Sequence, residues 1–180
     1  MSSKKLLHLD WGFIDETYSP KFLSDLLNKA ISEKRYGILQ YGNPSGILEL
    51  KEEVRKFLTS KFKIRKVDLS GLVITNGATA GFDLICRTVL KNKYDSIVFE
   101  PVFDTAIECL KVNSHKVYGV RINDDKGITK AMWNKLERLL SRNLTKLIYM
   151  IPNFNNPTGI LIPERDRKKL LTLCRENGVL

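Results

Sequence analysis

The sequence predicts an α/β fold in which a mostly parallel sheet is flanked by helices. From residue 72 onward, short apolar runs alternate with helical patterns, and this alternation is typical of consecutive strand–helix–strand units. Each apolar run is continuous, as expected for strands that are buried on both faces. The composition agrees, because 43% hydrophobic and 28% charged residues are ordinary values for a globular protein.

Residues 1–65 lack this alternation and predict an N-terminal arm with helices. Ser19 and Pro20 suit the N-cap and the first position of a helix, and apolar residues then recur at the spacing of a buried helix face. After a loop at 41–46, a second amphipathic pattern covers residues 47–58.

Four short apolar runs predict the strands of the sheet, because each has strand length and is bounded by turn residues or a helical pattern. These runs are residues 72–75, 96–99, 117–122 and 147–151. Helical patterns follow them at residues 80–90, through residue 110, from a Thr129 N-cap to residue 140, and at 163–177.

The last helical pattern is followed by Gly178, which suits the position after a helix C-terminus. Val179 and Leu180 then resemble the start of a further apolar strand. A buried strand seldom begins where a domain ends, so we expect these 180 residues to cover only part of a fold.

The formal net charge of +10 raises nucleic-acid binding as an alternative function. Lysines and arginines are scattered, however, and no block of five or more occurs. The densest cluster, at residues 165–169, includes Asp166 and is typical of a solvated helix face. A basic stripe with interleaved aromatic residues is missing, so we expect no nucleic-acid partner.

Membrane and metal functions have little support in the sequence. No apolar run approaches the ~18 residues of a membrane helix, and the first residues lack a signal-peptide core, so a cytoplasmic protein without a membrane partner is expected. Cys86, Cys109 and Cys174 form no CxxC pair and predict reduced core thiols. His8 and His115 are too few for a histidine-based metal site or a Ser-His-Asp triad.

Three unusual segments follow predicted strands, where open α/β sheets bind ligands. Residues 75–79 (TNGAT) open a helix, whose N–H groups and dipole suit a phosphate, although the same residue types also cap helices. Phe103 could stack on a flat heterocycle or belong to the core. Asn156, held extended by Pro157, could donate to a ligand oxygen or form a plain turn.

Four motifs occur in order between residues 41 and 159: YGNPSGILEL at 41–50, TNGAT at 75–79, EPVFD at 100–104 and NPTG at 156–159. Together they resemble the motifs of pyridoxal-phosphate (PLP) dependent aminotransferases of fold type I, class I/II. Lys51 stands where that family usually has arginine. The segment IPNFNNPTG is most similar to the corresponding segment of the kynurenine, aromatic and 2-aminoadipate aminotransferases.

The resemblance implies an aspartate aminotransferase-like fold. Residues 1–65 would belong to the small domain and the domain interface, and residues 66–180 would form the first part of the PLP-binding large domain. It also implies PLP as cofactor, a homodimeric full-length parent, and transamination between an amino acid and a 2-oxo acid such as 2-oxoglutarate. The alternative is a non-catalytic, truncated relative that binds a partner subunit.

By the same resemblance, the backbone N–H groups of Gly77, Ala78 and Thr79 would hold the PLP phosphate. Phe103 would stack on the pyridine ring. Asn156 would donate a hydrogen bond to the phenolic oxygen of the ring and lie beside the substrate.

Two further positions follow from the resemblance. Tyr41 would reach the phosphate of the neighbouring subunit's cofactor, and Gly12 would lie near the substrate carboxylate, although Ile14 replaces the proline of the family motif. The Schiff-base lysine of the family lies in a Ser-x-x-Lys stretch well after NPTG. No lysine here matches that stretch, so we assign no catalytic residue within these 180 residues.

Overall fold

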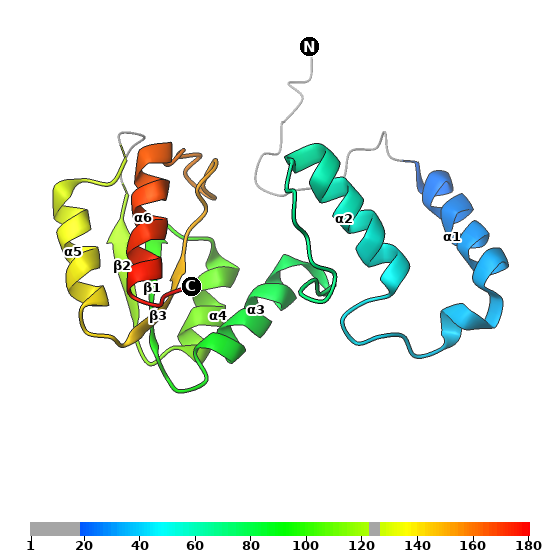
Figure 1. The fold of residues 1–180 in the computed structure, drawn as a ribbon, viewed down its shortest axis with the longest axis horizontal. Coiled ribbons are helices and arrows are strands. Elements are labelled where there is room, and N and C mark those ends of the chain that lie inside the picture. The colour runs from blue at the N-terminus through cyan, green and yellow to red at the C-terminus, as the bar shows by residue number, and fades with distance from the viewer. Residues whose placement is uncertain (1–18, 123–126) are drawn as a thin grey trace, which may run out of the picture.

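The computed structural model describes residues 19–122 and 127–180 (Figure 1). The elements follow in the order α1 (Pro20–Lys34), the 3-10 helix η1 (Arg35–Leu39), α2 (Leu48–Phe62), α3 (Gly77–Val89), β1 (Asp95–Glu100), α4 (Asp104–Asn113), β2 (Val117–Arg121), α5 (Lys130–Leu140), β3 (Thr145–Tyr149) and α6 (Glu164–Glu176). The predicted α/β class is confirmed.

The sheet is parallel and has the strand order β2-β1-β3. Ile97 of β1 lies opposite Tyr118 of β2 and Ile148 of β3. Alternate residues of β1 point to opposite faces, so Ile97 packs with α5 and α6 while Val98 packs with α3 and α4. The central strand is therefore covered on both sides, as its continuous apolar run predicts.

Helix ends follow the capping residues of the sequence. The Ser19 hydroxyl accepts the Lys21 N–H at 3.2 Å, with Pro20 in the first turn of α1. The Thr129 hydroxyl accepts the Met132 N–H at 3.4 Å at the start of α5. Gly178 has φ +60° just after α6, a conformation that glycine adopts at little cost.

The predicted strand at 72–75 is wrong, because these residues lie outside the sheet. β2 and β3 occupy both sides of β1. The outer edge of β3 is used by Leu180, which exchanges two backbone hydrogen bonds with Lys146 and Ile148 at 3.0 and 2.8 Å. Instead, the Ile74 N–H donates to the Ser45 carbonyl at 2.9 Å, which ties this segment to the 41–46 loop.

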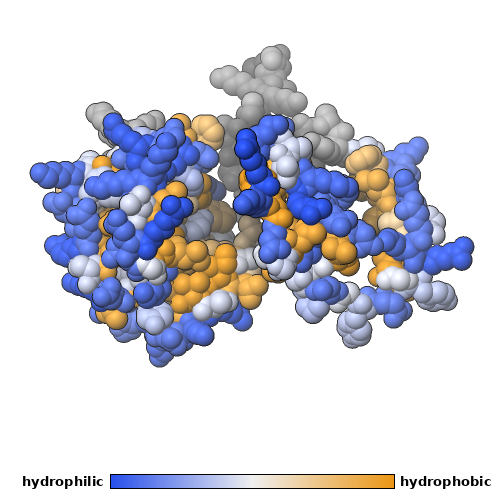
Figure 2. All heavy atoms as spheres, in the orientation of Figure 1, coloured by the Kyte–Doolittle hydropathy of each residue, from blue (hydrophilic) through white to orange (hydrophobic). Residues whose placement is uncertain are grey.

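The apolar face of α1 is exposed rather than buried. Phe22 and Leu27 remain 60% and 61% exposed, and α1 contains no buried residue. The reason is that α1 packs against η1, to one side of the sheet and its covering helices (Figure 1). Figure 2 shows apolar surface over this part of the molecule.

Candidate functional site

A cavity of ≈ 170 Å³ lies where α3 and α4 begin and β3 ends. The carboxyl ends of β1 and β3 lead to it, which is the edge where α/β sheets bind ligands. Three of the predicted residues, Ala78, Thr79 and Phe103, line this cavity together. The remaining lining residues are Phe82, Thr105, Ala106, Cys109 and Tyr149.

The N-terminus of α3 is open to an anion. The N-cap Asn76 makes no side-chain capping bond, and the first turn carries no acidic residue. The first-turn N–H groups of Ala78 and Thr79 therefore have no acceptor within the helix, and the helix dipole adds a partial positive charge. Gly77 has φ +85°, and a Cβ there would have no atom within 4 Å, so the approach is not crowded.

The Gly77 N–H, which is expected to hold a phosphate, makes a hydrogen bond within the chain. It donates to the Thr75 carbonyl at 2.8 Å, while the Thr75 hydroxyl donates to the Gly77 carbonyl at 3.0 Å. These two bonds close a tight turn ahead of α3. Gly77 is thus placed to shape the loop, and the N–H groups that remain for an anion are those of Ala78 and Thr79.

Two aromatic residues that the sequence reasoning missed form a wall of the cavity. The rings of Phe82 and Tyr149 lie 4.8 Å apart between centroids, tilted by 49°. Burial raises the pKa of the Tyr149 phenol. A signal was available, because Phe82 follows Ala78 and Thr79 by one helical turn and Tyr149 ends a strand at the ligand-binding edge.

Asn156 is exposed and is not among the residues that line the cavity. Its neighbour Asn155 links this segment to the turn that follows β1. The Asn155 Nδ2 donates to the Pro101 carbonyl and to the Thr158 hydroxyl, both at 3.0 Å. These bonds fasten the NPTG segment to the turn that precedes Phe103, a role that the sequence reasoning did not assign.

The other two predicted residues lie away from this cavity or outside the described ranges. The Tyr41 side chain is fully exposed, which leaves its phenol accessible to another subunit. Gly12 lies outside the part of the chain that the structure describes, as does Ile14.

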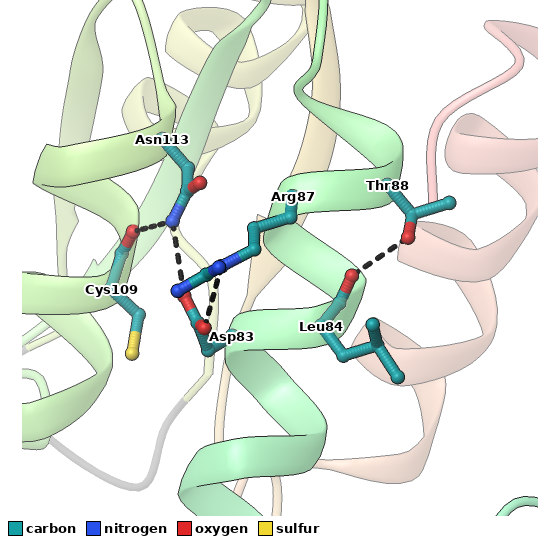
Figure 3. A network of polar contacts seen from close by, with 6 residues as sticks. All are labelled: Asp83, Leu84, Arg87, Thr88, Cys109 and Asn113. Atoms are coloured by element: carbon teal, nitrogen blue, oxygen red, sulfur yellow. Dashed lines mark hydrogen bonds and ion pairs between the residues drawn. The ribbon is translucent and has the colours of Figure 1, made fainter. Parts of the chain in front are cut away.

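A polar network holds α3 and α4, the two helices whose N-termini border the cavity (Figure 3). The Asp83 carboxylate pairs with the Arg87 Nε at 2.8 Å within α3. The Asn113 Nδ2 of α4 donates to Asp83 Oδ1 at 3.3 Å and to the Cys109 carbonyl at 2.8 Å. The Asn113–Asp83 bond therefore links the two helices directly.

The cysteines are unpaired thiols, and two of the three are buried. Cys86, Cys109 and Cys174 are free thiols, and burial is the main reason why the pKa of Cys86 rises to about 11. Burial also raises the pKa of Cys174. Within 19–122 and 127–180, no three His, Cys, Asp or Glu side chains are arranged to hold a metal ion, and no helix is long and apolar enough to cross a membrane.

Comparison with known proteins agrees with the motifs. The family model for aminotransferase class I and II matches residues 16–180. Aromatic-amino-acid aminotransferase 1 of Thermococcus litoralis is 27% identical over 165 residues, which cover 89% of this chain and 39% of that protein. The uncharacterized HTH-type transcriptional regulator YcxD of Bacillus subtilis is 30% identical over 154 residues, covering 85% of this chain and 33% of that protein.

A solved structure supports the same relationship. Pyrococcus horikoshii kynurenine aminotransferase, described in complex with PMP and kynurenine as substrates, matches with a TM-score of 0.76 and 28% identity. The match covers 89% of this chain and 40% of that one, so the chain spans well under half the length of these relatives. Because the family model matches far more than half of the sequence, the chain belongs to the aminotransferase class I and II family, and its sheet and helices form part of the aminotransferase fold.

Proposed function

We propose that this chain supplies part of the cofactor site of a PLP-dependent aminotransferase. Its full-length parent would move an amino group from an aromatic or 2-aminoadipate-like amino acid to a 2-oxo acid such as 2-oxoglutarate. The observation that carries the proposal is the cavity in which the uncapped start of α3 faces Phe103. The named activities of the relatives support the substrate class.

The residues present fit the cofactor. Its phosphate suits the N–H groups of Ala78 and Thr79, because the first turn of α3 carries no acidic residue. Its flat ring suits Phe103, which is half-buried at the N-cap of α4. Phe82 and Tyr149 add two further aromatic rings to the lining of the cavity.

PLP, when bound, supplies an electron sink for the bonds to the α-carbon of an amino acid. The residues of this chain would bind and orient it: the start of α3 neutralises the phosphate charge, and Phe103 fixes the ring plane. Asn156 is proposed to donate to the ring oxygen and to contact the substrate. The Asn155 bond to the Pro101 carbonyl keeps its loop beside the Phe103 turn.

The dimer is part of the same proposal. The exposed Tyr41 would reach the cofactor phosphate of a second subunit, and Gly12 would lie near the substrate carboxylate. We also propose that residues 1–65 belong to the small domain and the domain interface, and that residues 66–180 form the first part of the PLP-binding large domain. A cytoplasmic location is a further part of the proposal. In the family, the Schiff-base lysine lies in a sequence segment that has no match within these 180 residues.

Replacing Phe103 by alanine is expected to weaken cofactor binding about tenfold, because stacking on an aromatic ring contributes roughly 1–3 kcal/mol. Pyridoxamine phosphate is the suitable probe, since its amine does not form imines with surface lysines. Calorimetric titration of both proteins gives the ratio of dissociation constants.

The matched control is Phe22→Ala, which removes a ring that is 60% exposed on α1. It should leave the dissociation constant unchanged. Equal affinities of the Phe103→Ala variant and the unmodified protein would contradict the proposed ring site.

A second candidate is a non-catalytic relative that binds a ligand or a partner subunit. The similarity to a transcriptional regulator favours this alternative. The full-length protein separates the two. Formation of glutamate from 2-oxoglutarate and an aromatic amino acid supports the aminotransferase, whereas ligand binding without glutamate formation supports the alternative.

A further inference from the structure

Lys51 of α2 is unusual because its side chain is buried. The residue is only 7% exposed, whereas lysines are almost never fully buried without a partner. Its Nζ donates to the Ser45 hydroxyl at 3.0 Å. Among residues 19–122 and 127–180, this ammonium has no carboxylate within hydrogen-bond distance. The Ser45 oxygen accepts a hydrogen bond from Lys51, and the Asp68 carboxylate interacts with Lys51 electrostatically. The pKa of Asp68 is lowered mainly by hydrogen bonds from Ser70 and in part by Lys51.

Ser45 belongs to a compact turn. Its N–H and its hydroxyl both donate to Asn43 Oδ1 at 2.9 Å, and the Gly46 N–H donates to the Asn43 carbonyl at 2.9 Å. Because the Ser45 hydroxyl gives its proton to Asn43, its oxygen is free to accept from Lys51. The donor and the acceptor of each hydrogen bond among Lys51, Ser45 and Asn43 are thus fixed. Through these bonds, Lys51 anchors the turn to α2.

The same turn holds the segment that leads into the start of α3. The Ser45 carbonyl accepts the Ile74 N–H at 2.9 Å. Gly46 has φ +109°, and a Cβ there would overlap the Ile74 side chain, so the two backbones approach closely. Ile74 lies three residues before Gly77, which opens α3. A continuous series of contacts therefore joins Lys51 to the loop beside the candidate phosphate site.

We infer that Lys51 is a positioning residue for the cofactor phosphate. It does not touch the cofactor. It fixes the 43–46 turn, the turn fixes Ile74, and Ile74 sets how the Thr75–Gly77 turn presents the Ala78 and Thr79 N–H groups. The inference rests on the proposed function, because it assumes that a phosphate binds at the start of α3.

The test compares a probe that has the phosphate with one that lacks it. For the Lys51→Met variant, we expect the affinity for pyridoxamine phosphate to fall about tenfold, the worth of one charge-assisted hydrogen bond. The affinity for pyridoxamine should change less than about twofold, within the range of neutral substitutions. Lys51→Arg, which keeps a cationic donor, should recover most of the loss. Lys56→Met is the control, because Lys56 lies on the same helix but is exposed and pairs with Glu53.

Ser45→Ala separates positioning from simple electrostatics. It keeps the Lys51 charge but removes its acceptor, so it should lower the phosphate-dependent affinity in the same direction. The double variant should lose less than the sum of the two single losses, because both act through one contact. A normal affinity in Ser45→Ala, or an equal loss for both probes in Lys51→Met, would overturn the inference.

The outcome for the unmodified protein distinguishes this inference from the proposed function. If the unmodified protein binds pyridoxamine phosphate no better than pyridoxamine, the proposed phosphate site itself fails. If it prefers the phosphorylated probe and Lys51→Met keeps the same preference, only the role of Lys51 fails.

Discussion

Leu136→Ala is expected to lower the free energy of unfolding by about 3 kcal/mol, the usual cost of removing a buried leucine side chain. Leu136 of α5 is completely buried, and it packs in the cluster that contains Ile97 of β1 and Val120 of β2. Alanine would leave a cavity between the helix and the sheet. The closely packed core can relax only partly to fill it.

Denaturant unfolding followed by circular dichroism measures this loss. The matched control is Leu27→Ala on α1, where the leucine is 61% exposed. This control should change the free energy of unfolding by less than about 0.5 kcal/mol. Equal losses in the two variants would contradict the division between a packed sheet layer and an exposed N-terminal helix.

Gly127→Ala is expected to destabilise the protein by about 3 kcal/mol, for two reasons that add. Gly127 has φ +98°, where an alanine is strained by roughly 1–2 kcal/mol. The new Cβ would also overlap Asp166 Oδ2, which accepts the Ile128 N–H at 2.8 Å in a buried position. Displacing that carboxylate would leave a buried donor unsatisfied, at a further cost of about 1–3 kcal/mol.

Gly159→Ala isolates the backbone contribution. Gly159 also has a positive φ, +72°, but no atom lies within 4 Å of the position of its Cβ. This variant should lose only about 1 kcal/mol in the same unfolding experiment, the strain of the backbone alone. A loss in Gly127→Ala no larger than that in Gly159→Ala would show that the Asp166 contact is not needed.

Local patterns predicted the sheet layer well. The continuous apolar runs gave β1, β2 and β3, and Ser19 and Thr129 cap helices as their residue types suggest. These features depend on neighbours in sequence or on burial from both faces, which periodicity reports directly.

The failures share one cause, which is dependence on distant parts of the chain. The run at 72–75 has a strand pattern, yet a strand also needs a neighbouring strand to pair with, and hydropathy does not record which strands become neighbours. In the described part of the chain, the sheet contains only β2, β1 and β3. For the same reason, the apolar spacing of α1 indicates a face suited to burial without naming what covers it.

The candidate site was predictable in its types of residue but not in every position. Phe103 reaches the cavity because it follows the carboxyl end of β1. Ala78 and Thr79 reach it because they lie at the start of α3, although the strand predicted before them lies outside the sheet. Asn155, rather than Asn156, donates the hydrogen bond to the Pro101 carbonyl. A turn pattern does not show which of two adjacent asparagines makes such a bond. The burial of Lys51 was also hidden, since lysine is normally a surface residue.

The start of α3 and Phe103 are proposed to receive a phosphorylated ring together. Amide ¹H–¹⁵N spectra recorded during titration with pyridoxamine phosphate test this claim directly. We predict the largest shifts at Ala78, Thr79 and Phe103, with small shifts on α1. Shifts that avoid the start of α3 and cluster instead around His115 and Lys116, beside β2, would contradict the claim.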